Sequence, residues 1–287
     1  MATANMKDVK RRIKSVESTM QITKAMQLVA ASKLRRAKER AVAVQPFFET
    51  LFKTMCDISC DYAFTSVFTK KKFLNSTLLI VVAGDRGLAG GFNSNVLKTA
   101  QAKADAILAS GGELRVMAIG KKAVEYFEKR DYNLTDKYPQ IAEGLTSDQV
   151  MDIAEDIITR FRNRDFDKVD LVYTTFVSAL TQEPCELQIL PVENLENLGG
   201  RKHPATIYDP SPEEVFDGMI PQYISGMIYS AIVDSYASEQ AARRTAMESA
   251  SDNAGEMIDN LSLLYNRARQ AQITQELTEI SSASINK

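Results

Sequence analysis

Proline and glycine are scarce at both ends of this 287-residue chain. After Pro221 no further proline occurs, and only Gly226 and Gly255 interrupt the run. Proline removes a backbone donor and clashes with the preceding helical turn, so its absence permits one continuous helix over residues 221–287. Such a helix would be roughly 100 Å long, too long for the core of a chain of this size to bury. It must therefore pair along itself, protrude or be covered by other chains.

Cysteine, histidine and long apolar runs are also scarce. Three cysteines do not make a disulfide framework in a chain of this size, which fits a reducing compartment. Cys56 and Cys60 lie one helical turn apart, but without nearby histidine they fall short of a zinc site, and packing is the better interpretation. The single histidine, His203, has no partner in any local catalytic motif. Because no apolar run reaches about 18 residues and no signal peptide is present, we predict a soluble chain with no direct membrane insertion.

Acidic residues are few at the start of the chain, although the whole chain has a formal charge of −2. Residues 1–40 contain eleven Lys or Arg and three acidic residues, a net charge of +8. A solvated helix face, an acidic protein partner and a nucleic acid each explain this charge. The segment lacks interleaved aromatic residues and any groove-reading motif, so we predict that nucleic acid is not a partner.

The carboxyl-terminal helix has the apolar spacing of a coiled coil. Small and apolar residues recur at alternating steps of three and four, which predicts a seam facing another helix. The seam consists of Met247, Ala250, Ala254, Met257, Leu261, Leu264, Ala268 and Ala271. It then turns polar at Gln275 and Thr278, while Ile273, Leu277 and Ile280 begin a stripe on another face. This change of face indicates a change of partner.

The first 45 residues contain no proline or glycine and show the same spacing. Their seam consists of Val9, Ile13, Val16, Met20, Thr23, Gln27, Ala30, Leu34, Ala37, Ala41, Val44 and Phe48. A second long helix is predicted, and the two ends of the chain can pair only if they are antiparallel. Ile22, Met26 and Val29 form an extra apolar stripe. Ordinary core packing explains this stripe as well as a further partner does.

The middle of the chain alternates between strand and helix patterns. Residues 78–83 are the short Val/Ile-rich run of a buried parallel strand. Further strands are predicted at 114–119, 169–177 and 186–192, and helices at 94–109, from Lys121, and at 147–162. The pattern predicts a βαβ-type α/β domain. Glycines and prolines between residues 198 and 221 are expected to break the structure before the last helix.

A glycine-rich turn at residues 84–93 follows the first strand, so a nucleotide-dependent enzyme is one hypothesis. The glycines do not fit G-x-G-x-x-G, no G-K-[ST] follows, and the second strand ends at Gly120-Lys121 without an acidic residue. A tight turn with a helix cap near Asn93 or Ser94 is the favoured interpretation. We therefore predict no cofactor.

Three groups of motifs resemble the gamma subunits of F-type ATP synthases over essentially the whole chain. They are QITKAM (21–26) with VAASKLRR (29–36), DRGLAGG (85–91), and SEQAAR (238–243) with DN (252–253) and YNRARQAQITQE (265–276). The resemblance implies an α/β fold plus a long antiparallel α-helical coiled coil formed by the N- and C-terminal helices. Residues 1–60 and 211–287 would be the two helices of a rotating shaft, and residues 61–210 a Rossmann-like foot domain.

The resemblance also implies function, partners and location. The shaft would turn inside a ring of alternating alpha and beta subunits, and the foot would contact the epsilon subunit and the membrane rotor ring of c subunits. The chain would couple ion flow to ATP synthesis or hydrolysis and regulate ATPase activity, with no catalytic site, metal or cofactor of its own. It would be peripheral, at the cytoplasmic face of a bacterial cell membrane.

Candidate contact residues follow from matching motif positions. The resemblance assigns Lys24, Met26, Arg35 and Arg36 to the lever loops of the beta subunits. It assigns Arg269, Gln270, Thr274 and Glu276 to an upper contact with the catalytic ring, and Tyr208 and Asp209 to the rotor ring. Ion pairs between the two helices of the same chain are the alternative for these side chains.

Overall fold

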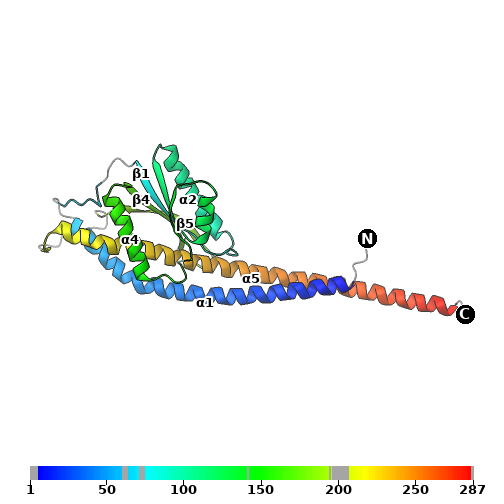
Figure 1. Ribbon diagram of the computed structural model, residues 1–287. Coiled ribbons are helices and arrows are strands. Elements are labelled where there is room, and N and C mark those ends of the chain that lie inside the picture. The colour runs from blue at the N-terminus through cyan, green and yellow to red at the C-terminus, as the bar shows by residue number, and fades with distance from the viewer. Residues whose placement is uncertain are drawn as a thin grey trace. The chain divides into compact units, whose positions relative to one another are not determined.

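The computed structural model describes residues 6–59, 64–70, 75–140, 142–193, 195 and 207–285. In chain order the elements are α1 (Met6–Ser59), β1 (Ser76–Val82), α2 (Phe92–Ala109), β2 (Glu113–Ile119), α3 (Lys121–Glu128), β3 (Leu134–Tyr138), α4 (Ser147–Arg162), β4 (Lys168–Phe176), β5 (Gln182–Leu190) and α5 (Pro212–Ile285) (Figure 1). The chain divides into two compact units. The helical unit contains residues 1–31 and 243–287, and the α/β unit contains residues 32–242.

The α/β unit is built on a five-stranded sheet with the order β3-β2-β1-β4-β5. β1 pairs in parallel with β2 and β4, β2 pairs in parallel with β3, and β5 is antiparallel to β4. All seven residues of β1 are buried. Leu79 and Val81 pack with α2 and α3, whereas Leu78 and Ile80 pack with α4, α5 and the end of α1. Burial on both faces explains why this strand is a continuous apolar run.

The predicted strands and helices of this unit are confirmed with small shifts of their ends. The helix predicted at 147–162 has those bounds, and Thr146 closes a capping box with Gln149. β3 was not predicted, because its five residues alternate between half-buried and exposed and include only one aliphatic residue. β5 begins at Gln182, four residues before the predicted start at 186. Pro184 lies inside this strand, which its place at the edge of the sheet permits.

The prediction that structure breaks until Pro221 is wrong. α5 begins at Pro212, and Pro221 lies inside it. Proline suits the first helical position because no hydrogen bond is needed from its nitrogen, and the Ser211 hydroxyl accepts from the Glu214 N–H at 3.2 Å. Buried Phe216, Ile220 and neighbouring apolar residues hold the helix across Pro221. α1 continues through Pro46 to Ser59 for the same reason, since its last turns also reach the core.

The helical unit confirms the predicted antiparallel pairing. Figure 1 shows the start of α1 lying beside α5, which continues beyond it to the carboxyl terminus. Val9, Thr23 and Ala30 of the predicted α1 seam are buried. The hydroxyls of Thr23 and Ser251 form a buried hydrogen bond of 2.6 Å between the helices.

The predicted α5 seam is wrong at four of its positions. Met257 and Leu264 are 46% and 51% exposed, Ala271 is also exposed, and Ala250 is half-buried beside the observed seam. The observed seam consists of Met247, Ser251, Ala254, Ile258, Leu261, Tyr265 and Ala268, of which the first three are buried and the others half-buried. A search for small and apolar residues passes over Ser251, whose hydroxyl is satisfied by Thr23.

Tyr223 of α5 is buried in the α/β core and stacks on Phe52 of α1, with ring centroids 6.1 Å apart. Burial raises the pKa of its phenol to about 12, from an ordinary 10. The neutral form is therefore favoured by folding, so this contribution to stability is complete below pH 10 and is lost as pH rises towards 12.

We expect Tyr223→Phe to reduce the alkaline loss of stability. Between pH 10 and 11 the native chain should lose about 1 kcal/mol more unfolding free energy than the variant, since one pKa unit corresponds to about 1.4 kcal/mol. Urea unfolding of the purified chain at pH 9 and at pH 11 measures this difference. Identical pH dependence of the two proteins would contradict it.

Candidate functional site

The carboxyl ends of β1 and β4 are where an open α/β sheet normally binds a ligand. The chain passes from β1 outward to β2 and β3 and returns to β4 on the other side of β1. A crevice forms at such a reversal of strand order, and nucleotides bind there in many proteins of this class. The nucleotide hypothesis therefore depends on whether this crevice is open.

In this chain α5 fills the crevice. The Ser235 hydroxyl accepts from the Thr174 N–H at 2.9 Å, and the Ser238 hydroxyl donates to the Thr174 carbonyl at 3.3 Å. Glu239 is buried against Gly84, so closely that a Cβ on this glycine would lie 2.9 Å from the Glu239 carboxyl carbon. A carboxylate thus occupies the position near the first turn where a phosphate would be bound. This arrangement disfavours a nucleotide-dependent enzyme.

The glycine-rich turn is itself a structural element. Asp85 Oδ1 accepts from the backbone N–H groups of Lys121 and Gln140, each at 2.8 Å, and so joins the ends of three neighbouring strands. Asn93 does not cap α2, whose N-cap is Gly91 without a side-chain hydrogen bond, and neither does Ser94. Asn93 instead accepts from the Gly84 N–H at 2.9 Å. The predicted cap is wrong because the turn uses this amide.

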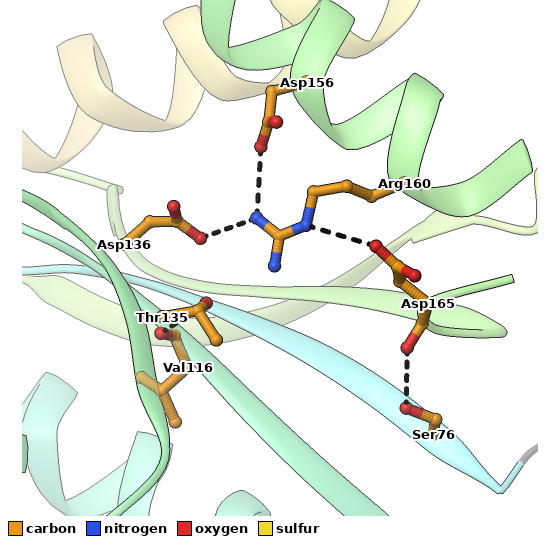
Figure 2. A network of polar contacts seen from close by, with 7 residues as sticks. All are labelled: Ser76, Val116, Thr135, Asp136, Asp156, Arg160 and Asp165. Carbon is orange, nitrogen blue, oxygen red and sulfur yellow. Dashed lines mark hydrogen bonds and ion pairs between the residues drawn. The ribbon is translucent and has the colours of Figure 1, made fainter. Parts of the chain in front are cut away.

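A second polar cluster surrounds Arg160 of α4 and is also structural (Figure 2). Its guanidinium lies 2.7 Å from Asp136, 3.1 Å from Asp156 and 4.0 Å from Asp165. Burial alone would lower the pKa of Arg160, but the hydrogen bonds that its guanidinium donates to the carboxylates of Asp136 and Asp156 raise it. The Asp165 carbonyl accepts from the Ser76 hydroxyl at 3.3 Å, which ties the cluster to the start of β1. The contacts attach α4 to the sheet.

The described residues offer little support for a metal site or a reactive thiol. In the described part of the chain no group of three or more His, Cys, Asp or Glu residues is arranged to hold a metal. Cys56 is buried and Cys185 is half-buried, and neither forms a disulfide. Cys60 and His203 lie outside the described residues. None of the described helices combines the length and the apolar character that crossing a bilayer requires.

The helical unit carries an exposed apolar surface on α1. Ile22, Leu28 and Val29 are each more than half exposed, while Met26 is half-buried beside the seam. Leu28 belongs to this surface but was not predicted, because it falls outside the regular spacing of the stripe. Lys24 lies on the same turns, is exposed, and forms no hydrogen bond or ion pair with any described residue. The surface is therefore open to a partner.

Arg35 and Arg36 lie further along α1, in the α/β unit, and both are exposed. Arg35 pairs with Glu39 of the same helix at 3.8 Å. Arg36 has no such partner among the described residues. An exposed pair within one helix contributes little to stability, so both guanidinium groups can turn to another chain.

The end of α5 carries the second group of candidate residues. From Arg269 to Thr278 every side chain is exposed. Thr274 donates to the backbone carbonyl of Gln270 at 2.9 Å, and Glu276 accepts from Gln272 at 2.9 Å. Arg269 forms no hydrogen bond or ion pair within the described ranges. Together with exposed Ile273, Leu277 and Ile280, these residues form a mixed polar and apolar surface.

Tyr208 and Asp209 precede α5 in the α/β unit. Tyr208 is half-buried and packs against the large core cluster. Asp209 is exposed. The two residues are neighbours only because they are adjacent in the sequence. Tyr208 is held by the core, whereas Asp209 is exposed to solvent.

Comparisons with known proteins give one family. Residues 5–284 match the family model described as ATP synthase. The chain is 77% identical to the ATP synthase gamma chain of Ruminococcus albus over 283 residues, covering 99% of both chains. It is 37% identical to a gamma chain of Acetobacterium woodii described as sodium ion specific, covering 96% of both chains.

Solved structures agree in fold. A chain of the central stalk and c ring of the Tetrahymena thermophila mitochondrial ATP synthase is 25% identical, with a TM-score of 0.61. The match covers 80% of this chain and 99% of that one. A chain of the Euglena gracilis mitochondrial ATP synthase, at 16% identity and a TM-score of 0.68, shares the fold over 98% of this chain and 93% of its own length.

Proposed function

Because the chain belongs to the ATP synthase gamma chain family, we propose that its paired helices turn inside a ring of alpha and beta subunits. A gamma chain is a non-catalytic subunit of the central stalk of F-type ATP synthase, and it couples ion flow to ATP synthesis or hydrolysis. The asymmetric orientation of such a rotor makes the surrounding catalytic sites inequivalent, so its rotation changes their relative affinities for nucleotides. The α/β unit contacts the epsilon subunit and the rotor ring of c subunits.

The observation that supports this proposal is the exposed surface of the helical unit. An isolated soluble chain has little reason to expose Ile22, Leu28 and Val29 together, and such apolar patches mark contacts with other proteins. The seam that α5 shares with α1 ends at Ala268, and the residues of α5 that follow are exposed. A surrounding sleeve of other chains accounts for both surfaces.

The candidate contact residues fall into three groups, one for each contact. Lys24, Arg35 and Arg36 present unneutralised or weakly paired positive charge to acidic lever loops of the beta subunits, with Met26 beside them. Arg269, Gln270, Thr274 and Glu276 lie on the exposed end of α5 and form the upper contact with the catalytic ring. Tyr208 and Asp209 serve the contact with the rotor ring.

The location follows from the assembly. A chain without a membrane-spanning helix among its described residues reaches the membrane through its partners. We place it as a peripheral subunit at the cytoplasmic face of a bacterial cell membrane.

Reversing three basic charges tests the lever contact. In the variant Lys24→Glu, Arg35→Glu and Arg36→Glu, ATP hydrolysis by the assembled alpha–beta–gamma complex should fall by about tenfold or more, since like charges facing each other cost several kcal/mol. The helix content of the purified chain by circular dichroism should stay unchanged, because all three side chains are exposed.

A matched control makes the same charge change elsewhere. Lys98→Glu, Lys129→Glu and Arg164→Glu are all exposed in the α/β unit and should leave hydrolysis near the native rate. Equal losses in both triple variants would exclude the lever contact. Salt-dependent binding of duplex DNA by the native chain that persists in the presence of alpha and beta subunits would instead favour the nucleic-acid hypothesis.

A further inference from the structure

The hydrogen-bonding edge of β4 extends beyond its neighbour β1. Pairing between these strands ends at Val81 and Val172, but β4 continues to Phe176. Alternate residues of a strand present their backbone groups to the same edge. The N–H and C=O of Thr174 and the N–H of Phe176 therefore lack a strand partner on the β1 side. Buried backbone groups of this kind need other partners.

Three polar side chains of α5, those of Asp234, Ser235 and Ser238, supply these partners. The Phe176 N–H donates to Asp234 Oδ1 at 3.2 Å. The Thr174 N–H donates to the Ser235 hydroxyl at 2.9 Å, and the Thr174 carbonyl accepts from the Ser238 hydroxyl at 3.3 Å. Ser235 and Ser238 are both buried. Within about one turn, α5 thus continues the hydrogen-bond ladder where β1 stops.

α1 is attached at the same edge of the sheet. The Lys38 ammonium lies over the Phe176 ring, 4.1 Å from its centroid. Leu34 and Ala37 of α1 pack with Ala237 and Ala241 of α5 in a separate small cluster. The segments of α1 and α5 that belong to the α/β unit are therefore both held at the end of β4, and the contacts of α5 there are directional.

Directional contacts resist a rotation that apolar contacts permit. Turning α5 about its axis against the sheet would break these hydrogen bonds and leave the backbone groups of Thr174 and Phe176 unpaired, which is costly for groups away from water. Apolar side chains would only exchange one neighbour for another. A rotor that transmits torque through this helix needs the first kind of contact.

We propose that Asp234, Ser235 and Ser238 form a torsional lock, which fixes the rotation of α5 about its axis relative to the sheet so that torque passes between them. These are positioning residues, because their hydrogen bonds are to β4 of the same chain: to backbone groups of Thr174 and Phe176 and, for Asp234, also to the side chain of Thr175. The inference rests on the proposed function, since only a rotor subunit experiences this torque. Its role is to limit twisting of the joint when the motor works against an opposing ion gradient.

The test uses the complete ATP synthase in sealed vesicles, with the variant Ser235→Ala and Ser238→Ala in the full-length chain. With an uncoupler present, ATP hydrolysis should match the native rate, because the motor then turns without opposition. Without the uncoupler, the variant should build a smaller ion gradient, and the ratio of uncoupled to coupled hydrolysis should fall by about twofold or more, as the loss of ordinary hydrogen bonds predicts. A role in stability alone would reduce the amount of assembled complex without changing this ratio.

Two matched comparisons complete the design. Ser225→Ala removes a hydroxyl that donates only to the Gln222 carbonyl of the same helix, and it should leave the ratio unchanged. Asp234→Asn keeps an oxygen that accepts from the Phe176 N–H and should behave as native, whereas Asp234→Ala should lower the ratio. The Asp234 pair decides the question if the double serine variant does not assemble.

An unchanged ratio in both the double serine variant and Asp234→Ala, in complexes that assemble fully, would overturn the lock and leave the proposed function standing. Failure of the native chain to assemble with alpha and beta subunits would instead remove the proposed function.

Discussion

Replacing Gly120 with alanine is expected to prevent stable folding of the α/β unit, at a cost of more than about 4 kcal/mol. Gly120 joins β2 to α3 with a φ of 94°. A Cβ there would lie 1.9 Å from the carbonyl oxygen of Ala83. That oxygen belongs to the backbone at the end of the central strand and cannot move aside, because the Ala83 N–H is bonded to the Ile119 carbonyl at 2.9 Å.

Gly111→Ala is the matched control. Gly111 also has a positive φ, of 80°, but no atom lies within 4 Å of its Cβ position. This substitution should cost only about 1–2 kcal/mol, the strain of the left-handed conformation alone. The unfolding free energies of both purified variants in urea separate the cost of backbone strain, which both share, from the cost of the collision with Ala83, which only the Gly120 variant has. Equal losses of stability would mean that the contact with Ala83 carries no cost.

Replacing Gly226 with alanine should destabilise the α/β unit by about 2–4 kcal/mol. A Cβ at this position of α5 would lie 1.6 Å from Cε1 of the Phe48 ring of α1. The ring must leave its place, and it would then withdraw from a cavity of about 350 Å³ that it lines together with Phe52, Tyr223 and Met227. Because Phe48 is half-exposed and can rotate, the expected cost is smaller than at Gly120.

A double substitution tests whether Phe48 is the cause. In the variant with Gly226→Ala and Phe48→Ala, the combined loss of stability should be smaller than the sum of the two single losses by about 1–3 kcal/mol. Gly218→Ala, in the same helix with no atom within 4 Å, should be neutral or stabilising by up to about 1 kcal/mol. Additive losses in the double variant would show that the helices do not approach each other at this glycine.

The parts of the fold that follow from local periodicity were predictable. The apolar run of β1 indicated a strand buried on both faces, and the spacing of α1 predicted most of its seam, including the polar position Thr23, although Ala41 is exposed. These patterns are regular because each element buries one continuous surface. The matching spacing of the two ends also predicted their antiparallel pairing, and the family resemblance added its role as a rotor shaft.

Other features depend on contacts that no local pattern records. The proline pattern placed the beginning of α5 too late, at Pro221, because the burial of Phe216 and Ile220 outweighs the cost of a proline inside a helix; the bounds that the resemblance implied, 211–287, lie close to the observed start at Pro212. The α5 seam was shifted because Ser251 is polar, and its partner Thr23 lies 228 positions away. Tertiary contacts decided both cases.

The candidate contact residues came from motif resemblance, and their chemistry alone did not distinguish them from a solvated basic face. The closure of the sheet crevice was not predicted at all. Ser235 meets Thr174 across 61 positions, and serine in a helix carries no signal that it will pair with a strand end. Gly84 is a glycine because a side chain there would collide with Glu239 of α5. Its presence in the sequence does not indicate this contact until the position of Glu239 is known.

The buried hydroxyl pair of Thr23 and Ser251 sets the axial alignment of the two helices in the helical unit. Sliding one helix along the other by one heptad would move it by about 10 Å and place each hydroxyl against apolar side chains. A buried polar pair in a mostly apolar seam therefore favours one alignment of the two helices over the others. The hydrogen bond between Thr23 and Ser251 thereby also determines how far the carboxyl-terminal end of α5 extends beyond the start of α1, although it lies many residues away from that end.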